Sequence, residues 1–278
     1  MTTGQRMGLL VCMNHVEPQP SPPCPPVITP LNPPVTPPRP PWGFWGTTGL
    51  GVALVSLYIL AQSIITVGYL FIQLVQHHGK LPLKLKEVAM DGDLVAIAII
   101  LGFSVTVFFT IWFIKLRQGP ALADYLGLRW PSWRALLLWS LGLAAVLIAS
   151  EGLTWLLDRS SVPEIMLDIY RSAQLKPLLW FSIVLFGPVA EEVIFRGFLF
   201  RGWQQSRLGN WGTILLTALL WAGIHLQYDA YGIAMIFAYG IFLGWVRSRT
   251  GSMLLCVVLH SALNLIATIQ VELYLATA

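Results

Sequence analysis

Long apolar segments, each about the length of a membrane-spanning helix, constrain this chain more than any other feature. A spanning helix needs about 20 mostly apolar residues, and seven runs approach or exceed that length. The fifth and sixth runs are short, so we expect tilted helices or a locally thinned bilayer there. Residues 162–176 have room for an eighth helix. The runs lie at about 49–75, 94–114, 135–157, 178–200, 211–226, 231–246 and 252–275.

The composition agrees with a polytopic membrane protein. Only 11% of the 278 residues are charged, whereas soluble domains have about 25%, and the mean hydropathy is +0.69. These values exclude an ordinary soluble enzyme, a disordered chain and a coiled coil. The sequence therefore predicts an all-α fold, a bundle of about seven or eight transmembrane helices within residues 47–278.

The net charge of +4 comes from 17 Lys and Arg against 13 Asp and Glu, and the basic residues lie mostly between the apolar runs. No nucleic-acid motif accompanies them, so we expect membrane lipid rather than nucleic acid as the surroundings of this charge. With seven spans, ten Lys and Arg lie on the N-terminal side and six on the other. This bias favours a cytoplasmic N-terminus for a multi-pass integral membrane protein.

Residues 1–46 form a separate, proline-rich region, in which 13 of the 24 residues from Pro18 to Pro41 are proline. Proline lacks an N–H donor and fixes φ, so this tail is expected to be extended, largely disordered and without a core. The simplest interpretation is a surface tail or linker, and the alternative is a binding site for a partner that reads proline-rich segments. The apolar run at 7–13 is shorter than a usual signal-peptide core, so we expect the tail to be retained.

Three apolar runs contain polar residues that are costly at bilayer depth and therefore need a reason. The fourth run contains Glu191, Glu192 and Arg196. Glu192 and Arg196 are four residues apart, with the acid first, which is the favourable order for an ion pair on one helix face. Glu191 points about 100° away and must find partners on other helices. The alternative to a catalytic site is a buried ion network that fixes helix packing.

The fifth run places Trp221 and His225 on one helix face, and the seventh does the same for His260 and Asn264. Taken singly, His225 has the more common interpretation of a packed or interfacial histidine. Likewise, His260 and Asn264 could simply hydrogen-bond between helices. Taken together, polar groups on three helices are satisfied most cheaply around one wet cavity. That set contains a general base and several hydrogen-bond donors.

The order and spacing of these residues resemble the CAAX-protease and bacteriocin-processing family (CPBP, or Abi) of intramembrane proteases, which includes Rce1-type enzymes that trim prenylated CAAX proteins. The resemblance covers roughly residues 120–270, and residues 126–129 are similar to the family's usual lead-in. Trp221 stands where phenylalanine is most usual, a change expected to keep the aromatic role without touching the chemistry. The resemblance rests on three motifs: Glu191-Glu192-x-x-x-Arg196, Trp221-x-x-x-His225 and His260-x-x-x-Asn264.

The resemblance implies an intramembrane endopeptidase, a hydrolase often labelled a metalloprotease, with CAAX-type C-terminal processing as one candidate activity. In that scheme Glu191 activates a water as general base and His225 holds the water or shares its proton. His260 and Asn264 donate hydrogen bonds to the oxyanion. The supporting residues are Glu192, Arg196 and Trp221.

Metal dependence is open at the level of sequence, because a water activated by glutamate needs no metal. Glu191, His225 and His260 could hold zinc with one open position. The HExxH zinc signature is absent from the sequence. We expect no obligatory metal.

Two other functions fit the same residues less well. A non-catalytic membrane scaffold or bacteriocin-immunity protein would make the proline-rich tail a partner-binding segment. A proton-coupled transporter also buries Glu and His, but it predicts inverted repeats, which the sequence does not show. The expected substrate is a peptide or a lipidated protein.

Overall fold

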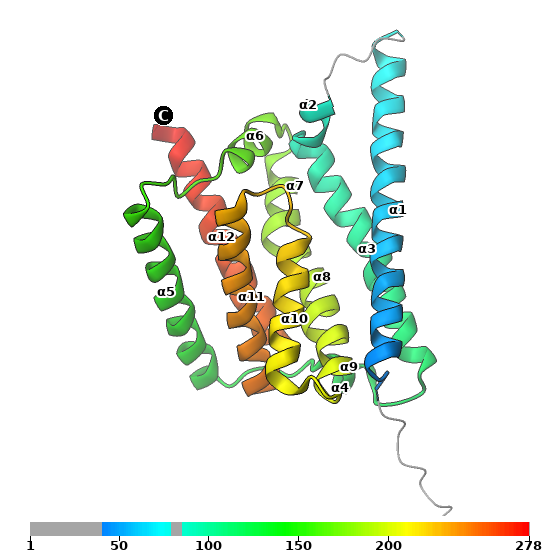
Figure 1. Cartoon of the computed structure of the whole chain (residues 1–278). Helices are drawn as coiled ribbons and strands as arrows, with labels where there is room; N and C mark the ends of the chain where they lie inside the picture. Colours follow the sequence, from blue (N-terminus) through cyan, green and yellow to red (C-terminus); the bar gives the residue numbers. More distant parts are fainter. Residues whose placement is uncertain (1–40, 79–84, 278) are drawn as a thin grey trace, which may run out of the picture. The chain divides into compact units, whose positions relative to one another are not determined.

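The structure is a computed structural model that describes residues 41–78 and 85–277, and all of its helices belong to one compact unit (Figure 1). No strand occurs within these residues, so the all-α fold is confirmed. The segments are α1 Phe44–Gln76, α2 Leu85–Ala89, α3 Gly92–Leu116, α4 Leu122–Leu126, α5 Trp133–Leu156, α6 Glu164–Ser172, α7 Lys176–Trp180, η1 Phe181–Phe186, α8 Gly187–Glu192, η2 Val193–Leu199, α9 Phe200–Gln204, α10 Gly209–Gly223, α11 Ala230–Thr250 and α12 Met253–Thr277.

Six of the described helices are long and apolar enough to cross a membrane, which confirms a polytopic bundle. The segments α7 to α9 form one continuous helix, Lys176–Gln204. Each of the six matches a predicted run within a few residues. The largest shift is at α1, which begins at Phe44 rather than at residue 49. The six are Phe44–Gln76, Gly92–Leu116, Trp133–Leu156, Lys176–Gln204, Ala230–Thr250 and Met253–Thr277.

The sequence predicted seven or eight spans, whereas six of the described helices are long enough to cross a membrane. The run at 211–226 forms α10, which has 15 residues and is therefore only about 22 Å long, shorter than the roughly 30 Å hydrocarbon core. The helix ends at Gly223, just before the polar connection that contains His225 and Asp229. The expected eighth helix exists as α6, but its nine residues are too few for a span.

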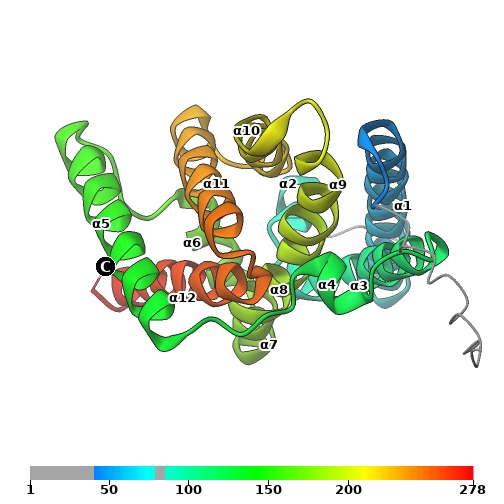
Figure 2. The same ribbon diagram turned by 90° about the horizontal axis from the view of Figure 1, so that it is seen from below.

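The short helix α10 is held by a close antiparallel partner, α11, which lies beside it in both views (Figures 1 and 2). Glycines on α11 make this approach possible. A Cβ atom at Gly240 would lie 2.9 Å from the Cβ of Ala218, and one at Gly244 would lie 3.1 Å from Ile214. Small residues at helix contacts are how membrane helices approach closely without a hydrophobic driving force. This close packing therefore holds α10 in place against α11.

The helix from α7 to α9 is the most enclosed span, with 56% of its most apolar window buried, against 6% for α1 and 6% for α5. Every residue of η2 is buried. In the view from below, α8 and α9 lie between α1 and α3 on one side and α11 and α12 on the other (Figure 2). The acidic pair of the fourth run therefore sits on the central helix, with other helices on several sides.

The proline-rich tail and its binding partner are predictions that lie almost wholly outside the described residues. Residues 41–43 precede the first helix, and residues 44–46, which the sequence assigned to the tail, are already helical. Trp42 donates its indole N–H to the carbonyl oxygen of Phe113 at 3.0 Å, so the entry to α1 is fixed on the end of α3. Which face of the membrane this end meets stays a prediction from the loop charges.

Candidate active site

The two adjacent glutamates lie in α8, between two π-helical turns, η1 and η2. Pro188 stands at the start of α8 and has no N–H to continue the regular hydrogen-bond ladder. A π turn inserts an extra residue and rotates the side chains that follow, and such turns are frequent at functional sites. Pro188 and the two π turns therefore set the direction in which the side chains of Glu191 and Glu192 point from the central helix.

Glu192 and Arg196 form a fully buried ion pair, with 0% of either side chain exposed. The guanidinium Nη1 donates to Glu192 Oε1 at 2.9 Å, and Nη2 donates to the carbonyl oxygen of Gly240 at 3.2 Å. The sequence predicted this pair from the four-residue spacing. The ion pair lies between the central helix and α11, and its two opposite charges neutralise each other.

His260 on α12 lies against both glutamates and is almost fully buried, at 2% exposure. Its Nδ1 is 2.9 Å from Glu192 Oε1, and its Nε2 is 3.9 Å from Glu191 Oε2. Because a carboxylate only accepts hydrogen bonds, Nδ1 carries a proton and donates it to Glu192. The neutral ring therefore turns an Nε2 lone pair toward Glu191, and Nε2 becomes a donor only when the ring is protonated.

Glu191 is the accessible member of the acidic pair, with 12% of its side chain exposed. The indole N–H of Trp221 donates to its Oε2 at 2.5 Å. Tryptophan was expected to keep the aromatic role of phenylalanine, and the structure adds a hydrogen bond that the sequence did not predict. Phenylalanine has no N–H donor, whereas the indole has one and uses it on the candidate base.

His225 and Asn264 lie at the edges of this cluster and are held by backbone carbonyls. His225 Nδ1 is 2.7 Å from the carbonyl oxygen of Trp221, so it is the protonated nitrogen and Nε2 is left as an acceptor. Asn264 donates its amide to the carbonyl oxygen of Ile183 at 2.9 Å. Among the described residues, no hydrogen bond joins either side chain to Glu191.

Two tyrosines outside the three motifs also lie within electrostatic range of Glu191, and the sequence analysis missed both. Tyr228 follows His225 in the α10–α11 connection and donates its hydroxyl to Met166 Sδ at 3.2 Å. Its pKa is raised to about 12, first by desolvation and then by the negative charge of Glu191. Tyr58 on α1 also experiences the negative charge of Glu191, although no hydrogen bond joins the two among the described residues. Tyr228 lies three residues after a motif histidine, but no comparable signal marks Tyr58.

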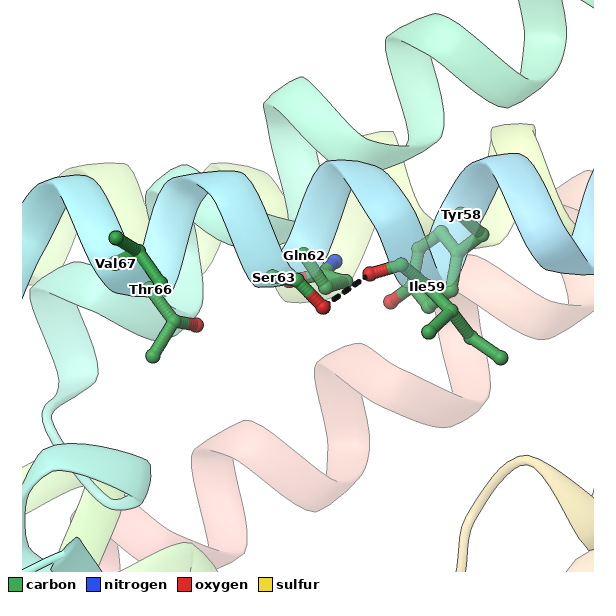
Figure 3. Close-up of a pocket in the computed structure, with 6 residues that line it drawn as sticks. All are labelled: Tyr58, Ile59, Gln62, Ser63, Thr66 and Val67. Atoms are coloured by element: carbon green, nitrogen blue, oxygen red, sulfur yellow. Dashed lines mark hydrogen bonds between the residues drawn. The ribbon is translucent and has the colours of Figure 1, made fainter.

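A hollow of about 430 Å³ lies against α1 beside Tyr58. The amide of Gln62 crosses to α3 and donates to the carbonyl oxygen of Ala98 at 3.0 Å. Ser63 donates back to the carbonyl oxygen of Ile59 at 2.8 Å (Figure 3). The hollow is therefore an open, largely apolar surface on α1 with a few polar groups. Its lining residues are Tyr58, Ile59, Gln62, Ser63, Thr66 and Val67.

The side chains suggested as zinc ligands do not fit a metal. Among residues 41–78 and 85–277, no group of three His, Cys, Asp or Glu side chains is arranged to hold a metal ion. With each Nδ1 hydrogen-bonded, the Nε2 atoms of His225 and His260 keep free lone pairs, so the misfit lies in the arrangement of the side chains and not in their hydrogen bonds. We derive no step through a metal.

Residues 173–266 match the family model described as type II CAAX prenyl endopeptidase Rce1-like. A protein of Escherichia coli described as an uncharacterized 24.3 kDa protein is 30% identical over 122 residues, which cover 43% of this chain. The matched part spans about half the length, 51%, of that relative. No solved structure matches.

The match to the family model contains all three motifs. It begins just before α7 and ends within α12, so it includes the central helix and every motif residue. The resemblance seen in the sequence is thereby confirmed over residues 173–266, which are similar to the Rce1-like family model.

Proposed function

We propose that the chain is an intramembrane endopeptidase that hydrolyses a peptide bond near the membrane by a water activated at Glu191. The observation that carries the proposal is the contrast between the two adjacent glutamates. Glu192 is fully buried and paired with Arg196, whereas Glu191 is partly exposed and accepts a hydrogen bond at only one of its oxygens from the residues that the structure describes. A carboxylate that is held in place yet reachable by water is suited to general-base catalysis.

The proposed reaction transfers a proton twice, first from the attacking water to Glu191 and then from Glu191 to the leaving amine. Glu191 takes a proton from water while the water oxygen forms a bond to the peptide carbonyl carbon. The tetrahedral intermediate then breaks its C–N bond, and the leaving amine takes the proton from Glu191. His225 turns an acceptor nitrogen outward, since its Nδ1 is bound to the carbonyl of Trp221, and that nitrogen would hold the attacking water.

The oxyanion requires donors, which we assign to Asn264 and to His260. Asn264 is oriented by the carbonyl of Ile183. His260 can donate through Nε2 only as an imidazolium, because its other nitrogen is committed to Glu192. Glu192 also accepts from Arg196, so it fixes the orientation of the His260 ring while its charge is already paired.

We expect cleavage to be independent of metal. The purified protein should keep its turnover number after exhaustive chelation, because its water is activated by a carboxylate and the nearby side chains do not form a metal-binding set. The measurement is activity beside elemental analysis of the same sample. Stoichiometric zinc whose removal abolishes cleavage, and whose return restores it, would contradict this part of the proposal.

The substrate we propose is an apolar peptide segment or the C-terminus of a lipidated protein, including CAAX-type C-termini, that approaches over the hollow on α1. Ile59 lines this hollow and is 58% exposed, whereas its neighbour Leu60 is 57% exposed and does not line it. The substitution Ile59→Trp should fill the hollow and raise KM about tenfold. The same change at residue 60 should leave KM unchanged, and equal effects at the two positions would exclude this path.

The proposed activity is tested with the protein reconstituted into liposomes and incubated with a panel of membrane peptides. The panel contains CAAX C-termini with and without a prenyl group, together with apolar peptides that lack the CAAX sequence. Mass spectrometry of the products identifies any new terminus. Cleavage restricted to prenylated CAAX peptides would assign the narrower substrate, and cleavage of apolar peptides would assign the broader one.

A further inference from the structure

The indole of Trp221 contacts several charged and polar members of the candidate site at once. Its N–H donates to Glu191 Oε2 at 2.5 Å, and the Cζ of Arg196 lies 4.8 Å from the ring centroid. The ring of His260 meets it edge to face, with centroids 5.1 Å apart at 85°. Only 3% of Trp221 is exposed, so the ring has little freedom to move.

The contact makes the two oxygens of Glu191 inequivalent. Oε2 accepts the indole N–H, whereas no hydrogen bond within residues 41–78 and 85–277 reaches Oε1. A single donor on one oxygen selects one side-chain rotamer and points the free oxygen in one direction. The guanidinium of Arg196 lies over the ring face in a cation–π arrangement, which adds to the contacts that hold the ring.

We propose that Trp221 is a positioning residue, which holds Glu191 in place through the hydrogen bond from its indole N–H. The inference rests on the proposed function, since it concerns the geometry of that reaction. It also goes beyond the motif, in which phenylalanine is most usual and could supply only the aromatic ring. In this chain the aromatic residue of the second motif also donates a hydrogen bond to the candidate base.

The alternative is a purely structural role, in which Trp221 only packs between α10, α11 and the central helix. A Cβ atom at Gly240 would lie 3.1 Å from the ring, so the packing there is tight. Phenylalanine keeps most of that packing and loses the N–H. A change that acts through position therefore lowers kcat, whereas a change that acts only through packing lowers stability.

Trp203 supplies a matched control for the test. It too is 3% exposed, and it too donates its indole N–H to a side-chain oxygen, that of Thr48 at 3.1 Å, on the α1 side of the central helix. Trp203→Phe therefore removes an equivalent hydrogen bond from an equally buried indole outside the site. Its effect on thermal stability measures what such a loss costs without any role in catalysis.

The experiment measures kcat, KM and thermal stability for wild type, Trp221→Phe and Trp203→Phe, each reconstituted with a peptide that the wild type cleaves. We expect Trp221→Phe to lower kcat by about 10- to 100-fold with KM nearly unchanged, because small misplacements of a catalytic group cost rate. Trp203→Phe should keep the wild-type kcat. Equal kcat values for the two variants, or a loss seen only in KM, would overturn the inference.

A second variant covers the case in which Trp221→Phe does not fold. A benzothienyl analogue of tryptophan at residue 221 replaces the N–H by sulfur and keeps the bicyclic shape. It should show the same loss of kcat, and full activity of the analogue would overturn the inference. A wild type that cleaves no peptide would instead refute the proposed function, so the two failures are distinguishable.

Discussion

Glu191→Gln is expected to lower the turnover number by about 10²–10⁴-fold, the usual contribution of a general base, while leaving the fold intact. Glutamine keeps the shape of the side chain, and its carbonyl oxygen can still accept from the indole N–H of Trp221. What it lacks is the ability to take a proton from water. The measurement is kcat for the reconstituted variant beside a thermal unfolding curve.

Glu151 on α5 is the matched control for this substitution. It is also a glutamate within a candidate span, and it accepts hydrogen bonds from Ser161 at 2.6 Å and Gln270 at 3.1 Å. Glu151→Gln changes the same chemical group in a polar network outside the site, so we expect the wild-type turnover number. If the two variants lost activity equally, the loss would belong to membrane carboxylates in general and not to a base at Glu191.

Arg196→Ala is expected to destabilise the fold by about 3–5 kcal/mol, the typical cost of removing one partner from a buried ion pair. Both Glu192 and Arg196 are fully buried, and the second oxygen of Glu192 already has no hydrogen-bond partner. Without the guanidinium, His260 would be the remaining hydrogen-bond partner of Glu192 among the described side chains. Unfolding followed by heat or denaturant in detergent measures the change.

Arg129→Ala is the appropriate comparison, because Arg129 pairs with Asp124 at 3.4 Å with both side chains more than half exposed. Exposed pairs of this kind contribute about 0–1 kcal/mol. We therefore expect Arg129→Ala to unfold close to wild type. A similarly small change for Arg196→Ala would show that the buried pair is dispensable for stability and that its charge is compensated in another way.

The parts of the fold that follow from local sequence could be predicted. Apolar runs of spanning length indicated the six long helices, and the four-residue spacing of Glu192 and Arg196 indicated the ion pair, since helix geometry alone brings them together. The cap of α11 is equally local, since Asp229 accepts from the N–H of Gly232 at 2.8 Å. Each of these depends on neighbours within one turn or one helix.

Contacts between distant segments could not be derived in the same way. His260 meets Glu192 across 68 residues, and Trp221 meets Glu191 across 30. The sequence indicated that these side chains need partners, but not which atom would face which. Tyr58 and Tyr228 were missed for the same reason, because an isolated tyrosine in or beside a span carries no spacing signal.

The most direct test compares the peptide termini of the membrane proteome in cells that carry wild type or Glu191→Ala at matched expression. The comparison covers all membrane proteins at once, so no substrate has to be chosen beforehand. A Glu191-dependent protease predicts new termini with the wild type that vanish with the variant, and those termini would name the substrates. Identical termini, with the variant still supporting any wild-type phenotype, would contradict proteolysis and favour a scaffold or immunity role.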